Sequence, residues 1–466
     1  MSADFSAALA RLLAQSVAGF RALRACERLS GGASQETWKV LADTVDGERC
    51  YALRRAAGGA PSAFAGAMGG IATEARLFQA ARAAGVPSPE ILRVFEPGDE
   101  LGAGFLMEWL DGETLGARIV RGDALAALRP QLARQCGAAL ARIHAIDTAP
   151  FKDALPLRTP EQLVRETWQQ YQSHGTPQPM IDFTARWLLD HLPPPVTPRL
   201  VHGDFRNGNL MIAPGRGITG VLDWELAHLG DPLRDLGWLC TASWRFGGEL
   251  PVGGFGTLDD LLEGYAAVAG ARPDAGALRF WTVFGSFWWS VGTLTMTQLH
   301  RNGSDRSAER AAIGRRSSEC QIDCVNLLIP GPVQPLTAGP APAALELPRA
   351  DELLSSAIDF LRDEVAARDR GRTGFLARVA SHSLEIVRRE AELGPHARER
   401  ECARLRSLLG RTGELAALRG ELAQALRHGP MALDHPGLAE HLRQSVADQM
   451  AVDQPRYAGY QAALKR

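Results

Sequence analysis

Residues 199–223 read RLVHGDFRNGNLMIAPGRGITGVLD, and the rest of the chain can be organised around them. The apolar segments RLV and LMI flank the polar loop HGDFRNGN, and the apolar run ITGVL ends at Asp223. Asp204 and Asn209 stand five residues apart on the loop, and Asp223 follows Asn209 by fourteen residues. Short apolar runs separated by a polar loop predict strands that bring these three side chains together.

This set of side chains suits phosphoryl transfer. A carboxylate beside an attacking hydroxyl orients it or accepts its proton, and amide and carboxylate oxygens are ligands that Mg²⁺ prefers. The alternative is local, because Asp and Asn also occur in turns where their side chains bond the nearby backbone.

The two motifs together resemble the aminoglycoside phosphotransferase family, a branch of the protein-kinase-like fold. HGDFRNGN is similar to the catalytic loop H-x-D-x-x-x-x-N, and LDWE at residues 222–225 is similar to the metal-binding position that follows it. GDPLRDLGWL at residues 230–239 matches the next element. The resemblance extends over about residues 25 to 325 and implies ATP or GTP as phosphoryl donor, Mg²⁺ as cofactor and a small-molecule hydroxyl as acceptor.

The resemblance also implies roles for individual residues. Asp204 is expected to be the catalytic base, and Asn209 and Asp223 are expected to ligate Mg²⁺. His202 and Asp235 are expected to support the catalytic loop.

Arg206 has two interpretations. Its planar guanidinium suits a phosphate or an anionic substrate, and it equally suits a neighbouring carboxylate.

The first 110 residues predict a small antiparallel sheet with one inserted helix. Residues 1–27 are expected to form an amphipathic helix, and the alternating segments ETWKVLAD and CYALRR are typical of strands. Residues 71–84 are expected to form the inserted helix, which the Gly-Val-Pro at 85–87 ends.

The strand CYALRR lacks the lysine that kinases use to hold phosphates. The chain has only three lysines, which are Lys39, Lys152 and Lys465. Residues 51–54, YALR, resemble the kinase pattern V-A-I-K, so Arg54 takes the lysine position and Glu74 resembles its helix partner. Alternation along the strand predicts that Arg54 and Arg55 face opposite sides and that one of them points to solvent.

Two further segments are predicted to contact the nucleotide. The turn that contains Gly31, Gly32 and Ser34 lies between two strands, where backbone N–H groups can approach phosphates. It departs from the kinase G-x-G-x-x-G pattern, and an ordinary hairpin loop is the alternative. FLMEWL at residues 105–110, with Glu108, resembles the hinge whose backbone bonds a purine, although an apolar edge strand would read the same way.

Composition limits the remaining possibilities. The formal charge of −2, from 51 basic and 53 acidic residues, argues against a nucleic-acid partner. The seven scattered cysteines and the lack of a signal sequence favour a cytoplasmic protein. The uncharged run at 280–299 is expected to be a buried helix rather than a membrane span, because Thr, Ser, Gly and Gln interrupt it.

These patterns predict an α+β chain with a two-lobed protein-kinase-like fold: a small antiparallel-sheet N-lobe at 1–110 and a mainly helical C-lobe at 111–328. A Pro-rich linker at 329–348 leads to an all-α domain at 349–466, rich in Ala, Leu, Arg and Glu, with four to six helices. We expect that domain to support a homodimer or to hold a protein partner.

Three functions remain open from the sequence. LSGGASQETW, the LRR triplet and HGDFRNGN resemble most closely the branch associated with acyl-CoA dehydrogenases, some of whose members phosphorylate hydroxyacyl-CoA compounds. A small-molecule kinase with such a substrate is therefore the main prediction. A non-catalytic nucleotide-binding scaffold is the second, and an aminoglycoside-type antibiotic kinase is the third.

Overall fold

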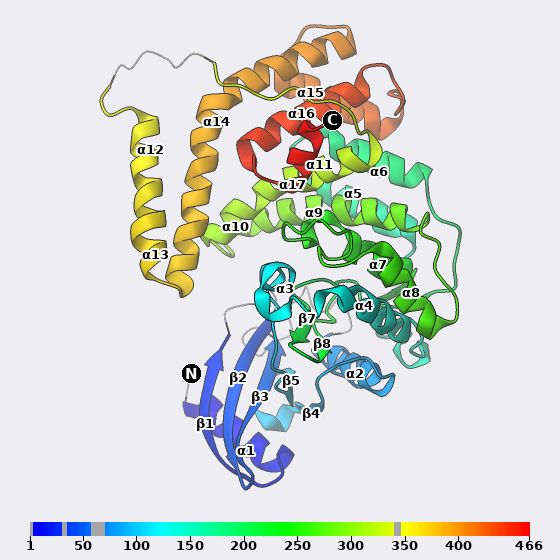
Figure 1. Ribbon diagram of the computed structural model, residues 1–466, viewed down its shortest axis with the longest axis vertical. Helices are drawn as coiled ribbons and strands as arrows, with labels where there is room; N and C mark the ends of the chain where they lie inside the picture. Colours follow the sequence, from blue (N-terminus) through cyan, green and yellow to red (C-terminus); the bar gives the residue numbers. More distant parts are fainter. Residues whose placement is uncertain (1–2, 30–34, 57–69, 340–345) are drawn as a thin grey trace. The chain divides into compact units, whose positions relative to one another are not determined.

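A computed structural model describes residues 3–29, 35–56, 70–339 and 346–466 (Figure 1). The chain divides into two compact units, each built from two separate segments. The first unit comprises Met1–Pro160 and Pro194–Trp281, and the second comprises Glu161–Pro193 and Thr282–Arg466. The boundaries proposed from the sequence at residues 110, 328 and 348 stay predictions.

The first unit begins with a five-stranded antiparallel sheet in the order β1-β2-β3-β5-β4. Its strands are β1 (Phe20–Arg28), β2 (Gln35–Thr44), β3 (Gly47–Ala56), β4 (Ile91–Val94) and β5 (Gly104–Glu108). Helix α1 (Ala3–Ser16) packs its leucines against Val40, Leu53 and Leu106 on one face. Helix α2 (Gly70–Ala83) packs Phe78 against Phe105 of the other face, with ring centroids 5.9 Å apart.

The expectation of one helix over residues 1–27 is wrong in its second half. The helix ends at Ser16, Gly19 turns the chain with φ +67°, and residues 20–28 pair with β2 as an edge strand. Two register shifts, between Phe20 and Ala22 and between Leu23 and Ala25, break the two-residue alternation of this strand. That irregularity removes the periodic signal from which a strand is recognised.

Small hairpins and helices complete the first unit. They are α3 (Gly116–Arg121), α4 (Arg129–His144), β6 (Arg199–Val201), β7 (Leu210–Ala213), β8 (Gly217–Val221), β9 (His228–Gly230), α7 (Leu233–Cys240) and α8 (Leu258–Ala269). Single 3-10 turns lie at η3 (Pro97–Asp99), η4 (Asp123–Leu125), η5 (Ala149–Phe151) and η6 (Ala242–Trp244). Helices α4 and α8 approach closely because Gly137 and Gly264 each face backbone of the other helix, where a Cβ would overlap it.

The regular secondary structure in the described part of the second unit is helical. Its elements are α5 (Pro160–Ser173), α6 (Pro179–Asp190), α9 (Leu278–Arg301, whose first turn belongs to the first unit), α10 (Ala308–Ile313), η7 (Gly314–Arg316), α11 (Ser317–Leu328), α12 (Ala350–Asp359), the π-helix η8 (Phe360–Val365), α13 (Ala366–Arg368), α14 (Arg372–Leu409), α15 (Leu415–His428), α16 (Leu438–Asp453) and α17 (Ala458–Leu464). Six of these α-helices fall within 349–466, as the sequence predicts. Figure 1 shows α12 and α13 running back along α14 as a helical hairpin.

A buried carboxylate ties α15 to α6 in this unit. Asp182 of α6 is fully buried and accepts hydrogen bonds from Trp168 Nε1 at 2.7 Å and Tyr171 Oη at 3.0 Å. Arg427 of α15 donates to the same carboxylate through Nε at 2.7 Å. A buried charge with three donors is well compensated, so this contact fixes α15 on α6.

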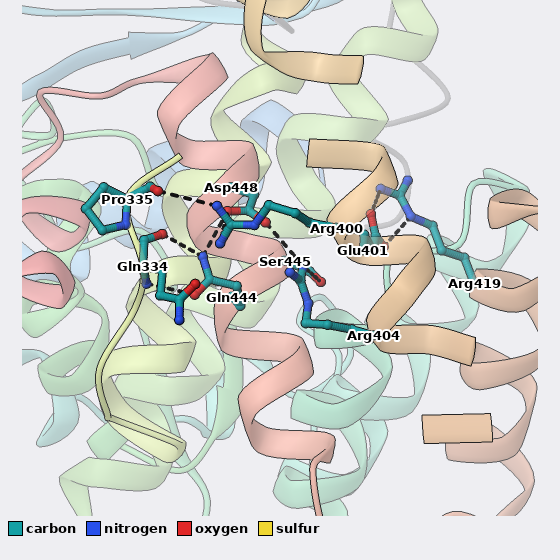
Figure 2. Close-up of polar contacts among 9 residues, drawn as sticks. All are labelled: Gln334, Pro335, Arg400, Glu401, Arg404, Arg419, Gln444, Ser445 and Asp448. Carbon is teal, nitrogen blue, oxygen red and sulfur yellow. Dashed lines mark hydrogen bonds and ion pairs between the residues drawn. The ribbon is translucent and has the colours of Figure 1, made fainter. Parts of the chain in front are cut away.

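The Pro-rich segment between α11 and α12 forms no helix or strand where it is described, and it docks on α16. Gln444 of α16 exchanges two 2.8 Å hydrogen bonds with the backbone of Gln334, and Arg400 of α14 donates to the Pro335 carbonyl at 3.3 Å (Figure 2). The segment therefore packs along the helices.

Helix α9 contains the uncharged run from residue 280 to 299. Val283, Phe284, Phe287 and Val291 of this run are buried, which confirms a buried helix. None of the helices in the described part of the chain combines the length and apolarity that crossing a bilayer requires.

Candidate active site

The loop between β6 and β7 holds the carboxylate of Asp204 in one orientation. Trp238 Nε1 of α7 donates to Oδ1 at 2.8 Å, and Arg206 Nε donates to the same oxygen at 2.9 Å. Asn209 Nδ2 donates to Oδ2 at 2.6 Å. Three donors on a side chain that is 13% exposed fix its direction while leaving it reachable.

Arg206 contacts a carboxylate in this structure rather than open solvent. Besides its bond to Asp204, its NH1 group donates to the Asn207 carbonyl at 2.9 Å, and its guanidinium lies 4.3 Å from the ring centroid of Trp244. Gly208 has φ +107°, and a Cβ there would overlap the Arg206 side chain. The second glycine of HGDFRNGN thus makes room for this arginine.

Asn209 and Asp223 are brought together by the β7–β8 hairpin. Leu210 pairs with Val221, and the next bond runs from the Leu222 N–H to the Asn209 carbonyl at 2.8 Å. Asp223 follows with φ +66°, a conformation that non-glycine residues rarely adopt. Residues held in such sparsely populated conformations are concentrated at functional sites, which makes Asp223 a candidate.

The donor set fits Mg²⁺. Because Nδ2 of Asn209 bonds Asp204, the amide oxygen of Asn209 is turned away from that carboxylate. Together with the carboxylate of Asp223, which is 30% exposed, it offers hard oxygen ligands of the kind that Mg²⁺ takes.

Arg54 joins the sheet to this hairpin. Its Nε lies 3.0 Å from Glu74 Oε1 of α2, and its NH2 group lies 2.6 Å from Asp223 Oδ1. Burial raises the pKa of the Glu74 carboxyl, and the charge of Arg54 opposes that shift. The pairing of Arg54 with Glu74 expected from the sequence is present, while their contact with a nucleotide stays a prediction.

Arg55 departs from its expectation. It lies on the opposite sheet face from Arg54 but does not point to solvent, because α1 covers that face. Its Nε contacts Glu36 at 2.7 Å, and its guanidinium lies 4.5 Å from the ring of Phe5 in α1. The side chain is only 16% exposed.

Asp235 of α7 braces the loop that carries Asp204. It is fully buried and accepts the backbone N–H groups of His202 and Gly203, each at 2.8 Å, while its Oδ2 lies 3.1 Å from His144 Nε2. Burial alone would raise the pKa of Asp235, but the hydrogen bond and charge of His144, with the charges of His202 and Arg234, lower it to about 2. Asp235 therefore stays ionised.

His202 links the loop that carries Asp204 to the segment that leads to Asp223. Its Nδ1 accepts the Asp204 N–H at 3.2 Å, and its Nε2 lies 3.1 Å from the Leu222 carbonyl. Burial lowers the pKa of His202, although the charges of the nearby carboxylates act to raise it. A neutral imidazole that carries its proton on Nε2 satisfies both contacts, so His202 acts as a support.

The side chain of Glu108, at the end of β5, is tied to the α2–β4 connection. Its Oε2 accepts the Glu90 N–H at 3.1 Å and lies 3.5 Å from Arg82. The neighbouring Trp109 contacts Lys39, whose Nζ lies 5.1 Å from the indole centroid. Any nucleotide contact by this segment would therefore use its backbone.

Some predicted residues cannot be placed, and some important ones were not predicted. Gly31, Gly32 and Ser34 lie outside the described residues. Trp238 holds the Asp204 carboxylate and His144 contacts its brace Asp235, yet neither residue was predicted. Trp238 stands within GDPLRDLGWL, so that element was the available signal for it, whereas His144 sits on α4 with an ordinary helical pattern.

Comparison with known proteins adds independent evidence. Residues 25–281 match the model of the phosphotransferase enzyme family, and residues 367–457 match a domain of unknown function. The chain is 35% identical over 226 residues to acyl-CoA dehydrogenase family member 10 of Mus musculus and 33% identical over 163 residues to family member 11 of Gallus gallus. These alignments cover 45% and 33% of this chain but 20% of each relative, so the chain spans about a fifth of their length.

A solved structure from Ralstonia eutropha JMP134, provisionally named as an aminoglycoside phosphotransferase, shares the fold. The TM-score is 0.55 at 24% identity, covering 68% of this chain and 95% of that one. The fold class expected from the sequence is thereby confirmed. Because the family model covers more than half of its residues, the chain belongs to the phosphotransferase enzyme family and has the protein-kinase-like fold.

Proposed function

We propose that this chain transfers the γ-phosphoryl group of ATP or GTP to a hydroxyl of a small molecule. The observation that carries the proposal is the carboxylate of Asp204, which accepts hydrogen bonds from Trp238, Arg206 and Asn209. A residue that only capped a turn would not need an indole from another helix and a guanidinium to fix it.

The chain's own residues would divide the work as follows. Asp204 would orient the acceptor hydroxyl and take its proton as the new phosphorus–oxygen bond forms and the bond to the nucleotide's β-phosphate oxygen breaks. Arg54, fixed by Glu74, would contact phosphate oxygens from the sheet. Asn209 and Asp223 would hold Mg²⁺, which when bound supplies charge neutralisation at the phosphates. Catalysis would rest on positioning and electrostatics.

The acceptor we propose is a hydroxyacyl-CoA-type compound. The support is the resemblance of the motifs and the names of the relatives, which are acyl-CoA dehydrogenase family members 10 and 11. The cytoplasmic location and a homodimer or protein partner through residues 349–466 stay predictions.

The test is phosphate transfer by the purified chain, with Mg²⁺ and ATP or GTP, to a panel of hydroxyacyl-CoA thioesters and aminoglycosides. We expect transfer to the thioesters, and we expect Asp204→Ala to lower it at least about a thousandfold while the protein stays folded. Nucleotide binding without turnover on any acceptor would favour the scaffold, transfer to aminoglycosides alone would favour the antibiotic kinase, and full activity of Asp204→Ala would overturn the assignment.

A further inference from the structure

The second unit contains a pocket that no part of the proposed reaction uses. Its volume is about 400 Å³, and its lining residues come from α6, α9, α10, α11, α14, α15 and α16 and their connections. Its apolar wall includes Met180, Leu294, Leu442 and Val446. A cavity of this size with a largely apolar wall is typical of small-molecule sites.

A buried imidazole in the wall lacks a partner. His441 of α16 lines the pocket and is 2% exposed, yet its Nδ1 makes no hydrogen bond within the described part of the chain. A buried polar atom left unpaired costs free energy, and structures usually satisfy such groups with protein, water or ligand.

The surroundings of His441 are positively charged. Figure 2 shows Arg400 and Arg404 of α14 converging on the single carboxylate of Asp448, at 3.6 and 3.2 Å. Arg419 of α15 meets Glu401 through a pair of parallel contacts, one of them 2.6 Å long, and both residues line the pocket. Burial, with the charges of Arg404 and Arg419, lowers the pKa of His441 to about 3. The imidazole is therefore neutral at pH 7.

The charge balance of the wall leaves a positive excess. The guanidinium groups that line it are those of Arg301, Arg315 and Arg419, and the carboxylates that line it are those of Glu401 and Asp453. Arg315 pairs with Asp453 and Arg419 pairs with Glu401. Three positive groups against two negative ones in the lining favour a ligand with one negative charge. Arg301, at the exposed end of α9, is the arginine of this set for which the described residues supply no carboxylate within ion-pair distance.

We propose that this pocket binds a small amphipathic monoanion, namely a linear alkanoate of about six to ten carbons. Its carboxylate accepts a hydrogen bond from the Nδ1–H tautomer of His441, within the field of the neighbouring arginines, and its chain lies along the apolar wall. Arg301 attracts the anion to the pocket. The site lies outside the candidate phosphotransfer residues and does not depend on the function proposed for them.

Calorimetric titration of the full chain without nucleotide tests the proposal, with octanoate as ligand and octan-1-ol as the uncharged match. We expect saturable binding of about one octanoate per chain and at least about tenfold weaker binding of the alcohol. His441→Phe should weaken octanoate about tenfold or more, and Arg301→Gln severalfold. His428→Phe, at the exposed end of α15, and Arg306→Gln, an exposed arginine outside the pocket, should leave the affinity unchanged.

Equal affinity for octanol, unchanged affinity in His441→Phe, or no saturable binding for any alkanoate from butanoate to decanoate would overturn the proposal. If His441→Phe does not fold, the imidazole nitrogen signals of the wild-type chain provide the second readout, because octanoate must shift those of His441. Asp204→Ala should bind octanoate normally, so failure of the proposed phosphotransfer function and failure of this site are distinguishable.

Discussion

Two adjacent arginines on β3 allow phosphate binding to be separated from fold stability. Arg54 and Arg55 are 14% and 16% exposed, and each contacts a buried glutamate, Glu74 and Glu36 respectively. They differ in the sheet face they occupy, since Arg54 also reaches Asp223 at 2.6 Å. Substituting each arginine by Met keeps a long apolar stem and removes only the charged end.

The expected losses of stability depend on which ion-pair partners each glutamate retains in the variant. Glu74 is 3% exposed, so losing Arg54 leaves a buried charge, at a cost of about 3–5 kcal/mol. Glu36 retains Arg28 at 3.3 Å, so Arg55→Met should cost less, about 1–3 kcal/mol. Both proteins should therefore fold but melt earlier.

The Arg54→Met protein should also show a distinctive pH dependence. Burial already raises the pKa of Glu74 above its ordinary value of 4.5, and removing the opposing charge of Arg54 raises it further. The folded chain then holds a proton that the unfolded chain has released. The free energy of unfolding of the variant should therefore fall as pH rises above about 4.5, more steeply than that of the wild type.

The two variants should differ strongly in catalytic activity. At a temperature where both are folded, Arg54→Met should lower kcat/KM for the nucleotide about 10²–10³-fold, the usual cost of losing one preorganised charge at the reacting group. Arg55→Met should stay within about threefold of wild type, since its contacts lie on the far face. Equal activity of the two variants, with both shown to be folded by circular dichroism, would refute a phosphate-binding role for Arg54.

Three further results are expected. Trp238→Phe should lower kcat about 10–100-fold in steady-state assays with little change in KM, because Asp204 loses one donor and its fixed orientation. The folded-state pKa of Asp235 is lowered from 3.8 to about 2. Its ionised form therefore adds about 2 kcal/mol to the free energy of unfolding above pH 4, and this contribution is lost as the pH falls toward 2. Asp235→Asn should accordingly reduce the loss of stability measured between pH 4 and pH 2. Chelation of Mg²⁺ should abolish transfer, and Asp223→Asn should raise the Mg²⁺ concentration needed for half-maximal rate, which a metal titration measures.

The parts of the site that the sequence could predict are local in the chain. Asp204 and Asn209 share one loop, and Asp223 follows the second strand of the adjoining hairpin, so their spacing alone places them together. The pairing of Arg54 with Glu74 was expected from the resemblance to the kinase strand and helix, while alternation predicted only that Arg54 and Arg55 take opposite faces.

The parts that escaped prediction depend on contacts between distant segments. Trp238 reaches Asp204 across 34 residues, and His144 reaches Asp235 across 91. The element GDPLRDLGWL was noted without a role for its tryptophan, and the helical pattern around His144 does not distinguish it from a core side chain. Arg55 could not be predicted as buried because its cover, α1, was itself expected to run on through the edge strand β1. The bulges of β1 conceal its alternation, and that single irregularity produced both errors.

The shortage of lysine has a structural consequence at Arg54. Lys39 lies on the same sheet face, opposite Ala52, but it contacts Trp109 rather than Glu74, so it does not replace the strand lysine of kinases. A guanidinium presents separate nitrogens, and here Nε meets Glu74 while NH2 meets Asp223. A lysine ammonium would have to contact both carboxylates from a single nitrogen. Arginine at this position therefore links α2, the sheet and the candidate metal-binding hairpin through one planar group. These contacts explain how the fold can have arginine where kinases have lysine.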